Sequence, residues 1–229
     1  MPERSDMNTL SNVNTRGGET NPPSVRPAPD AFPDAKSTQT GVSVRYVYHE
    51  EKQWFVFRAS YGRVDKASDF LVEDNTYTYI AKRYTYKIIQ GKRKRILVPL
   101  IPNLLFAYTT REKAREYVHA TPALSYLTFY YNHFELEGDK NPPLIISDAD
   151  MAQFIIETRN HNEHLIFIDA QRNHFKHGEQ VRVVKGPFKG VEGIVTRIAG
   201  QQRVAVNIKG LGVIATAYIP TAFLEKTNC

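Results

Sequence analysis

The sequence predicts an α+β protein in two parts: an antiparallel sheet with flanking helices, followed by a small region of strands alone. Up to about residue 159, strand-like runs alternate with segments of helical periodicity. From about residue 178 onward, short runs of alternating apolar residues are separated by turns that contain glycine. The first 43 residues are rich in Pro, Ser, Thr, Asn and Asp, and are expected to form a disordered tail.

The composition excludes several classes of protein. The chain has 229 residues and a net charge of +6, and no apolar run approaches the ~20 residues needed to span a bilayer. The amino terminus lacks the apolar core of a secretory signal. Cys229 is the lone cysteine, which excludes an intrachain disulfide and a thiolate-rich metal site. We therefore expect a cytoplasmic monomer that is not associated with a membrane and needs no cofactor.

Changes in composition suggest four segments. Residues 1–43 form the tail, whose charges nearly cancel, so it is a tether or spacer and not a basic arm for nucleic acid. Residues 44–159 form the first domain, 160–175 a linker with one short docking strand near Leu165–Ile168, and 176–229 the second domain.

The first domain is predicted from local patterns. Strands are expected at 54–59, 76–89 and 124–135, with a broken apolar run at 96–108, and helices at 63–73, 110–119 and 148–158. Pro99 and Pro102 interrupt the apolar run, so strand pairing must lapse there. Ser147 resembles an N-cap for the last helix, with Asp150 at the third helical position.

A basic segment stands out within this domain. Between Asn75 and Thr110 there is no acidic residue, whereas seven residues are basic and tyrosines are interleaved with them. Gly91 is expected to begin a tight charged turn that runs to Arg95. Clustered positive charge attracts phosphate backbones, and aromatic rings can stack on unpaired bases. An equal alternative is a solvated hairpin whose tyrosines pack on the sheet.

The second domain opens with a glycine-punctuated pair of strands, residues 178–198. Pro187 fixes φ for a turn, while Gly186 and Gly190 permit backbone angles closed to other residues. Gly193, inside the second strand, suggests a bulge or a close backbone approach. Lysines beside this turn are placed to meet an acidic partner.

Residues 178–198 resemble the KOW motif, found in small SH3-like β-barrels of transcription factors and ribosomal proteins. Upstream, Trp54–Arg58, Tyr61–Arg63 and Val98–Phe106 resemble the amino-terminal (NGN) domain of the NusG family. The order of an NGN-type domain, a linker and a KOW-type barrel is the NusG layout, over about residues 50–227. The segment 142–158 and the apolar run 99–102 are most similar to specialised UpxY-type paralogs, which are antiterminators of capsule polysaccharide operons. Asn103 replaces the family's usual Gly, and Asn tolerates positive φ better than most residues.

The resemblance implies a transcription elongation or antitermination factor. Such a factor would bind the RNA polymerase clamp through the NGN-type domain, suppress pausing or termination, and recruit Rho or ribosomal protein NusE through the barrel. A partly exposed apolar patch is expected to bind polymerase: Trp54, Phe55, Leu100, Ile101, Pro102 and Leu104. Trp54 or Phe55 is also expected to be core, because alternate strand residues face opposite sides.

Two further sets of residues are candidates for binding. By resemblance, Arg63, Lys113 and Arg115 would reach non-template DNA in the transcription bubble; Arg93, Lys94 and Arg95 are added from charge alone. In the barrel, Lys185, Phe188 and Lys189 are candidates for binding the second partner, with a core position for Phe188 an equal alternative.

Other functions are less well supported. No phosphate-binding glycine loop or nucleophile constellation is present, so an enzyme is not expected. His161/His164 and His174/His177 form two His-x-x-His pairs, but they lie in the polar linker without a carboxylate motif. The alternative to a polymerase-binding factor is a KOW-type RNA-binding module associated with the ribosome, against which the NGN-like segment argues.

Overall fold

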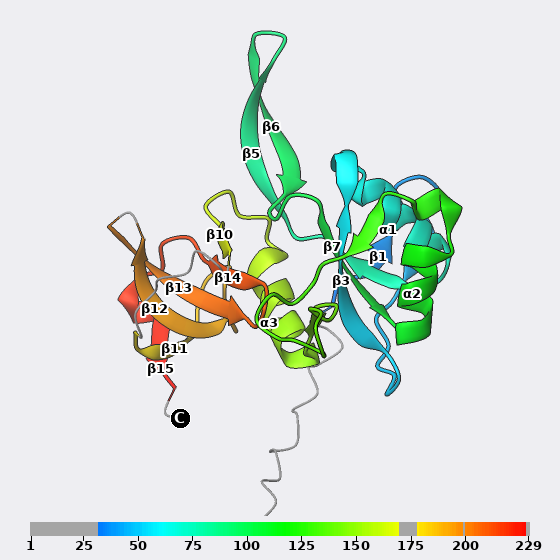
Figure 1. Cartoon of the computed structure of the whole chain (residues 1–229). Coiled ribbons are helices and arrows are strands. Elements are labelled where there is room, and N and C mark those ends of the chain that lie inside the picture. Colours follow the sequence, from blue (N-terminus) through cyan, green and yellow to red (C-terminus); the bar gives the residue numbers. More distant parts are fainter. Residues whose placement is uncertain (1–31, 170–177, 199, 228–229) are drawn as a thin grey trace, which may run out of the picture.

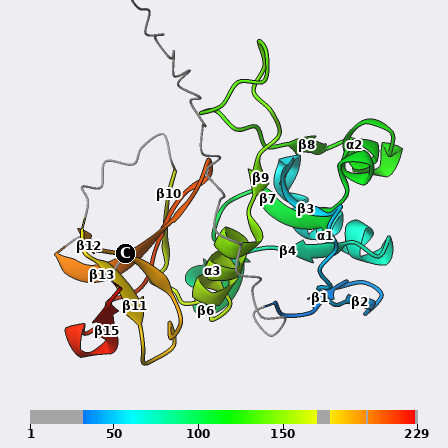
Figure 2. The same cartoon turned by 90° about the horizontal axis from the view of Figure 1, so that it is seen from below.

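A computed structural model describes residues 32–169, 178–198 and 200–227 of the chain (Figures 1 and 2). It has an N-terminal α+β domain and a C-terminal all-β sheet, as the sequence predicts. In both views the two parts lie on either side of helix α3, Asp148–Thr158.

The N-terminal sheet is antiparallel and has five strands. Its order is β4–β7–β3–β8, with β9 also paired to β3; the bounds are β3 Gln53–Ala59, β4 Tyr77–Tyr79, β7 Leu104–Thr109, β8 Leu127–Phe129 and β9 Ile145–Ile146. Alternate side chains of β3 enter two different cores, because successive residues of a strand point to opposite faces. Trp54 and Val56 lie in one buried cluster, and Phe55 and Phe57 in the other.

Three helices cover the two faces. α1 Val64–Glu73 and α2 Arg111–His119 contribute to the cluster around Phe55, while α3 contributes to the cluster around Trp54. The predicted cap of α3 is present: the Ser147 hydroxyl accepts a hydrogen bond from the Asp150 amide at 3.1 Å. Single 3-10 turns occur at Ser60–Gly62, Pro122–Leu124 and Thr221–Phe223.

Part of the segment predicted as a disordered tail, residues 32–43, has defined structure. Residues 35–44 contain two short paired strands, β1 Ala35–Lys36 and β2 Ser43–Val44. The Phe32 ring is buried and stacks on Tyr46 with centroids 3.9 Å apart, and Thr38 donates hydrogen bonds from its amide and hydroxyl to the Asp69 carboxylate. A boundary at residue 43 is therefore wrong for residues 32–43, since one aromatic ring and an Asp69 acceptor hold this otherwise polar segment. The rest of the predicted tail, residues 1–31, lies outside the described residues.

The predicted strand at 76–89 is two strands in different sheets. After β4 the chain passes Ile80 and Ala81 and enters β5 Lys82–Ile89, which pairs in register with β6 Lys92–Pro99. This pair forms a sheet of its own and projects from the domain (Figure 1). As predicted, pairing lapses between the two prolines, because β6 ends at Pro99 and β7 begins at Leu104.

The turn of this hairpin differs from the prediction. It lies at Gln90–Gly91, whose φ angles of 52° and 73° are both positive, as in a two-residue type I′ turn. The positive charges of Lys92 to Arg95 consequently lie along strand β6 and not in the turn.

The predicted strand at 124–135 is limited to β8. Beyond it, residues 131–143 form a loop closed by a bridge between Tyr131 and Pro143 (Figure 2). The Asn141 side-chain amide donates hydrogen bonds at 2.9 Å to the carbonyls of Asn132 and Glu135. The loop is thus held by the Asn141 side chain and by isolated backbone bridges, and not by a continuous ladder.

The C-terminal sheet is antiparallel and has six strands. Its order is β10–β14–β13–β12–β11–β15, with bounds β10 Ile166–Asp169, β11 Gln180–Val183, β12 Glu192–Ile198, β13 Gln201–Ile208, β14 Gly212–Ala215 and β15 Leu224–Lys226. β10, which lies before residues 170–177, pairs with β14, as predicted for the short docking strand.

The positive φ angles and the close backbone approach that the sequence predicts are present. Gly186 and Gly190 have φ angles of 81° and 94°, and Asn103 has φ of 65°. At Gly193 a Cβ atom would lie 2.4 Å from the Ala205 carbonyl oxygen, so the expected close approach is present.

Contacts between the two domains run along α3 and its flanks. Buried residues of α3 share one continuous cluster with residues of the C-terminal sheet, such as Phe154 with Val204. Gln153 Oε1 accepts from the Glu192 amide at 3.1 Å, and Arg203 Nη1 donates to the His164 carbonyl at 2.8 Å. Asn160 also donates from its side chain to the Pro187 carbonyl.

Candidate functional site

The predicted apolar patch is almost entirely buried. The exposed fractions are 0% for Trp54, 1% for Phe55, 6% for Leu100, 5% for Ile101 and 4% for Leu104, whereas Pro102 is exposed. The expectation of a partly exposed patch is therefore wrong for this conformation. Phe55 faces the α1–α2 core, and the other four buried residues lie in the cluster shared with α3 and the C-terminal sheet.

Pro102 lies at the tip of a well-defined turn. The Leu100 amide donates to the Ala81 carbonyl at 2.8 Å, and the Asn103 carbonyl accepts from the Ala59 amide at 2.8 Å. Asn103 supplies the positive φ that lets the chain reverse between the prolines and β7. The turn is thus held to β3 at one end and to the start of the hairpin at the other.

Aromatic rings surround Trp54. The centroids of Phe32, Tyr46, Tyr77 and Tyr108 all lie within 5.8 Å of the Trp54 centroid. Burial raises the pKa of Tyr46 and of Tyr77, so their hydroxyls stay protonated and act as donors. The Tyr77 hydroxyl donates to the Pro33 carbonyl, which ties the cluster to the N-terminal segment. This arrangement is structural, and it removes Trp54 from the surface.

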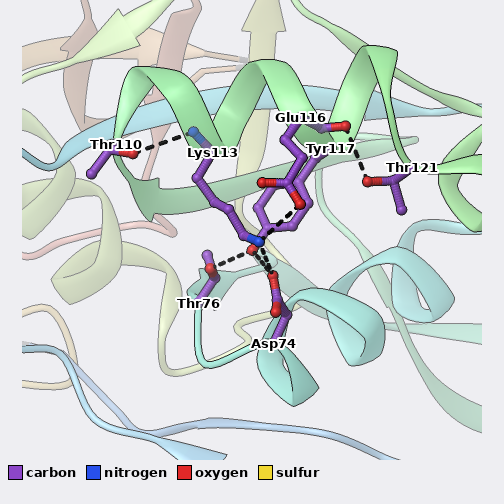
Figure 3. A network of polar contacts seen from close by, with 7 residues as sticks. All are labelled: Asp74, Thr76, Thr110, Lys113, Glu116, Tyr117 and Thr121. Carbon is purple, nitrogen blue, oxygen red and sulfur yellow. Dashed lines mark hydrogen bonds and ion pairs between the residues drawn. The ribbon is translucent and has the colours of Figure 1, made fainter.

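Lys113 is engaged in a polar network between α2 and the end of α1 (Figure 3). Its Nζ lies 2.9 Å from Asp74 Oδ2 and 3.1 Å from Glu116 Oε1, and these carboxylates raise the lysine pKa. Burial acts to raise the pKa of Asp74, but hydrogen bonds from Tyr117 and Lys113 lower it overall. Two carboxylates therefore compete with any phosphate for Lys113.

The two arginines predicted by resemblance, Arg63 and Arg115, are more accessible than Lys113. The Arg63 guanidinium lies over the Tyr126 ring, 5.1 Å from its centroid, and both Arg63 and Arg115 are exposed. Arg115 also lines a hollow of about 120 Å³ together with Arg111, one helical turn earlier. Sequence reasoning missed Arg111, although the i, i+4 spacing on α2 places both side chains on one face.

The basic hairpin carries a ladder of stacked side chains. The Arg95 guanidinium carbon lies 3.8 Å from the Tyr84 ring centroid, and that of Arg93 lies 4.0 Å from the Tyr86 centroid. Lys94 stands directly opposite Lys87 in the register. Tyr77 and Tyr79 are buried in the domain, as the alternative of tyrosines packed on the sheet predicts, whereas Tyr84 and Tyr86 stack on arginines of the hairpin itself.

The base of the hairpin is fixed to the segment that follows α3. The Tyr84 amide donates to the His161 carbonyl at 3.0 Å, His161 Nδ1 lies 3.1 Å from the Lys82 carbonyl oxygen, and Arg83 donates to the Leu165 carbonyl at 3.2 Å. Lys82 also pairs with Asp65 at 2.6 Å. Among the described residues, no group of three or more His, Cys, Asp or Glu could hold a metal ion; His174 and His177 lie outside them.

The three candidate residues in the turn between β11 and β12 of the C-terminal sheet differ in accessibility. Lys185 and Lys189 are exposed, but Phe188 is only 3% exposed and belongs to the buried cluster. Of the two alternatives for Phe188 the core position holds, because the Lys189 amide bonds the Gly186 carbonyl and the chain folds the ring inward. The accessible part of this site is thus the pair of lysines.

In the described part of the chain, no helix has the length and apolarity to traverse a bilayer.

Comparison with known proteins identifies the family of the first domain. No curated protein matches the chain. A solved structure described as "Domain interaction in Thermotoga maritima NusG" is 19% identical, with a TM-score of 0.38, and the match covers 77% of this chain and 98% of that one. Residues 52–155 match the family described as "Transcription termination factor nusG". The domain that these residues form therefore belongs to the NusG family of non-enzymatic transcription factors.

Proposed function

We propose that this protein is a transcription elongation or antitermination factor that binds the RNA polymerase clamp and suppresses pausing or termination. The observation that carries the proposal is the NusG-family match over residues 52–155. The N-terminal domain makes the polymerase contact, and the C-terminal sheet recruits a second protein. The protein acts in the cytoplasm on transcription complexes.

The polymerase contact centres on the turn at residues 100–104. Pro102 is its exposed tip, while Leu100, Ile101 and Leu104 lie just beneath in the cluster shared with α3 and the C-terminal sheet. Apolar side chains next to an exposed tip suit an amphipathic helix of the polymerase. A full contact of this kind requires that part of the shared cluster become accessible.

Exposed cations at three places contact nucleic acid: the start of α1, helix α2 and the hairpin. Arg63 and Arg115 reach the non-template strand, with Arg111 as a neighbour on α2; Lys113 contributes less because Asp74 and Glu116 already hold it. Arg93, Lys94 and Arg95 on the hairpin add a separate nucleic-acid contact.

The C-terminal sheet recruits its partner through Lys185 and Lys189, which flank the turn and are exposed. An acidic surface on the partner fits this pair, and Rho or ribosomal protein NusE follows from the KOW resemblance. A specialised, UpxY-like role at one operon is supported by the sequences of segments 142–158 and 99–102.

The test uses an exposed position, because truncating buried Ile101 or Leu104 would cost about 2–5 kcal/mol of stability. Pro102→Glu is expected to abolish copurification of polymerase subunits, whereas Leu136→Glu, at a residue 73% exposed on another loop, should retain it. Equal retention by both variants would overturn the clamp assignment. Recovery of ribosomal RNA in place of polymerase would support the ribosome-associated alternative.

A further inference from the structure

The outer part of the hairpin, residues 85–96, has an unusual charge balance for a protein surface. It contains five basic residues and no acidic one, and residues 86–95 are all exposed. β5 and β6 pair only with each other among the described strands (Figure 1), and an isolated two-stranded ribbon has little stability of its own. The concentrated charge indicates an anionic ligand.

The charge lies on both faces of the ribbon. Residues directly opposite in an antiparallel pair share a face, so one face carries Tyr84, Tyr86, Ile88, Arg93 and Arg95. The other face carries Lys87, Ile89, Lys92 and Lys94. Lys87 and Lys94 are direct neighbours of like charge, an arrangement that disfavours the ribbon unless an anion lies between or beside them. A ligand that meets only one face would leave half of this charge unused.

The stacked arginines argue against a platform for unpaired bases. Single strands bind by laying bases on open aromatic rings. Here the guanidiniums of Arg95 and Arg93 lie over the Tyr84 and Tyr86 rings at 3.8 and 4.0 Å. A stacked guanidinium keeps its N–H groups in a fixed plane and directs them to phosphate oxygens. A guanidinium covers one face of each ring, and the cations are preorganised for phosphate.

The dimensions fit a DNA groove. Five residues of a strand, 85–89, extend about 17 Å beyond the anchored base, and the major groove of B-DNA is about 12 Å wide and 8.5 Å deep and admits a two-stranded ribbon. A phosphate strand borders the groove on each side, which matches cations on each face. Ile88, 80% exposed beside the turn, can meet thymine methyl groups on the groove floor. A-form RNA has a major groove too narrow for this.

We infer that the β5–β6 hairpin inserts into the major groove of duplex DNA, with Arg93 and Arg95 against one phosphate strand and Lys87 and Lys94 against the other. The clamp at its base, where His161, Leu165 and Asp65 hold residues 82–84, keeps the ribbon directed outward. The inference rests on the proposed function in one respect only, which is that the duplex lies beside a transcribing polymerase.

The experiment measures binding of the full chain, without polymerase, to a fluorescent 20-base-pair DNA duplex, its single strand and the corresponding RNA duplex, from low to moderate salt. The DNA duplex is expected to bind most tightly. Arg93→Gln/Arg95→Gln and Lys87→Gln/Lys94→Gln should each lower the slope of log affinity against log salt by about two. Ile88→Ser should weaken duplex binding without changing that slope.

Two controls keep the outcome decisive. Lys185→Gln/Lys189→Gln removes two charges from the C-terminal turn and should leave the slope unchanged. Arg93→Lys/Arg95→Lys keeps the charge but loses the stacking on the tyrosines, and it should keep the slope. If the Gln variants acted by disordering the ribbon, the Lys variants would lower the slope as well. Tighter binding to the single strand or to the RNA duplex, or an effect of one face alone, would overturn groove insertion. If polymerase copurifies normally but duplex binding fails, only this inference fails, and the proposed function stands.

Discussion

Two segments that project from the N-terminal domain, the β5–β6 hairpin and the loop 131–143, differ in how they are stabilised and in their charge. The β5–β6 hairpin is held by a complete strand register, carries only positive charge in its outer part, and pairs with no other described strand. The loop at 131–143 has no such ladder, contains three acidic residues and one lysine, and touches the C-terminal sheet. Its Glu135 pairs with Lys209 at 3.0 Å, and Asn132 lies beside Gly210.

The difference concerns what each projection stabilises. The hairpin can open without disturbing a core, so its sequence is free to serve a ligand. The loop borders Leu144 and Gly210, where the two domains meet, so its sequence is constrained by packing. The same substitution should therefore have different consequences in the two places.

The largest effect is expected for Gly210→Val. Gly210 has φ of +78°, and an added Cβ would lie 2.6 Å from Leu144 Cδ1, so both backbone strain and overpacking oppose the valine. We expect a loss of about 2–4 kcal/mol in the free energy of unfolding. Urea unfolding followed by fluorescence of Trp54, the lone tryptophan, measures it.

Gly91→Val is the matched control for this change. Gly91 also has positive φ, but an added Cβ would have no atom of the described residues within 4 Å, and the outer hairpin lies outside both cores. Global stability should fall by under about 1 kcal/mol, with faster amide exchange confined to residues 82–99. Equal losses for the two glycines would refute the contrast between the projections.

An intermediate effect is expected inside α3, which lies between the domains. Glu157 is fully buried, its carboxylate has no hydrogen-bond partner among the described residues, and burial raises its pKa well above the usual value. The folded state therefore binds more protons than the unfolded state between the two pKa values, and stability falls as pH rises through that window. Glu157→Met removes this loss and should gain about 1–4 kcal/mol at pH 8.

The measurement compares urea unfolding of the parent and the variant at pH 5 and pH 8. Other groups titrate in both proteins, so the difference between the two isolates Glu157. A gain that is the same at both pH values would show that the carboxylate is not the cause.

The smallest effect is expected at the tip of the loop. Glu135 and Lys209 form an exposed pair, with 51% and 82% of their side-chain surfaces accessible. A double-mutant cycle with Glu135→Gln and Lys209→Gln should give a coupling of about 0.5 kcal/mol that disappears at high salt. A coupling well above this would mean that the loop holds the domains together by charge and not by packing at Gly210.

Structural features that depend on residues close together in the sequence were predictable. The α3 helix follows from its Ser147 cap and apolar spacing, and the positive φ of Asn103, Gly186 and Gly190 follows from residue type and turn context. The hairpin was predictable as a basic ribbon, but its turn was not, because Gln90 is an uncommon residue at positive φ. The concentration of charge in Lys92–Arg95 gave a false indication of a turn.

Structural features that depend on contacts between residues far apart in the sequence were not predictable. Phe32 is ordered because Tyr46 and Trp54 receive its ring, and neither contact is visible from the polar residues around it. Leu100 and Ile101 have the composition of a binding patch, yet the cluster formed with α3 and the C-terminal sheet buries them. The neighbourhood of Arg111 and Arg115 follows from their spacing, but the hollow beside them exists only because Phe129 and Ile145 complete its lining.

By itself, the sequence determined the two-part α+β organisation, the helices, the glycine-dependent turns and the basic character of residues 82–95. These depend on periodicity, capping and conformational preference, which act over a few residues. Only the tertiary structure decided which candidate side chains are accessible: Pro102, Lys185 and Lys189 are, while Trp54, Leu100 and Phe188 are not. Accessibility depends on which surfaces pack together across the chain, and local sequence carries no direct record of that.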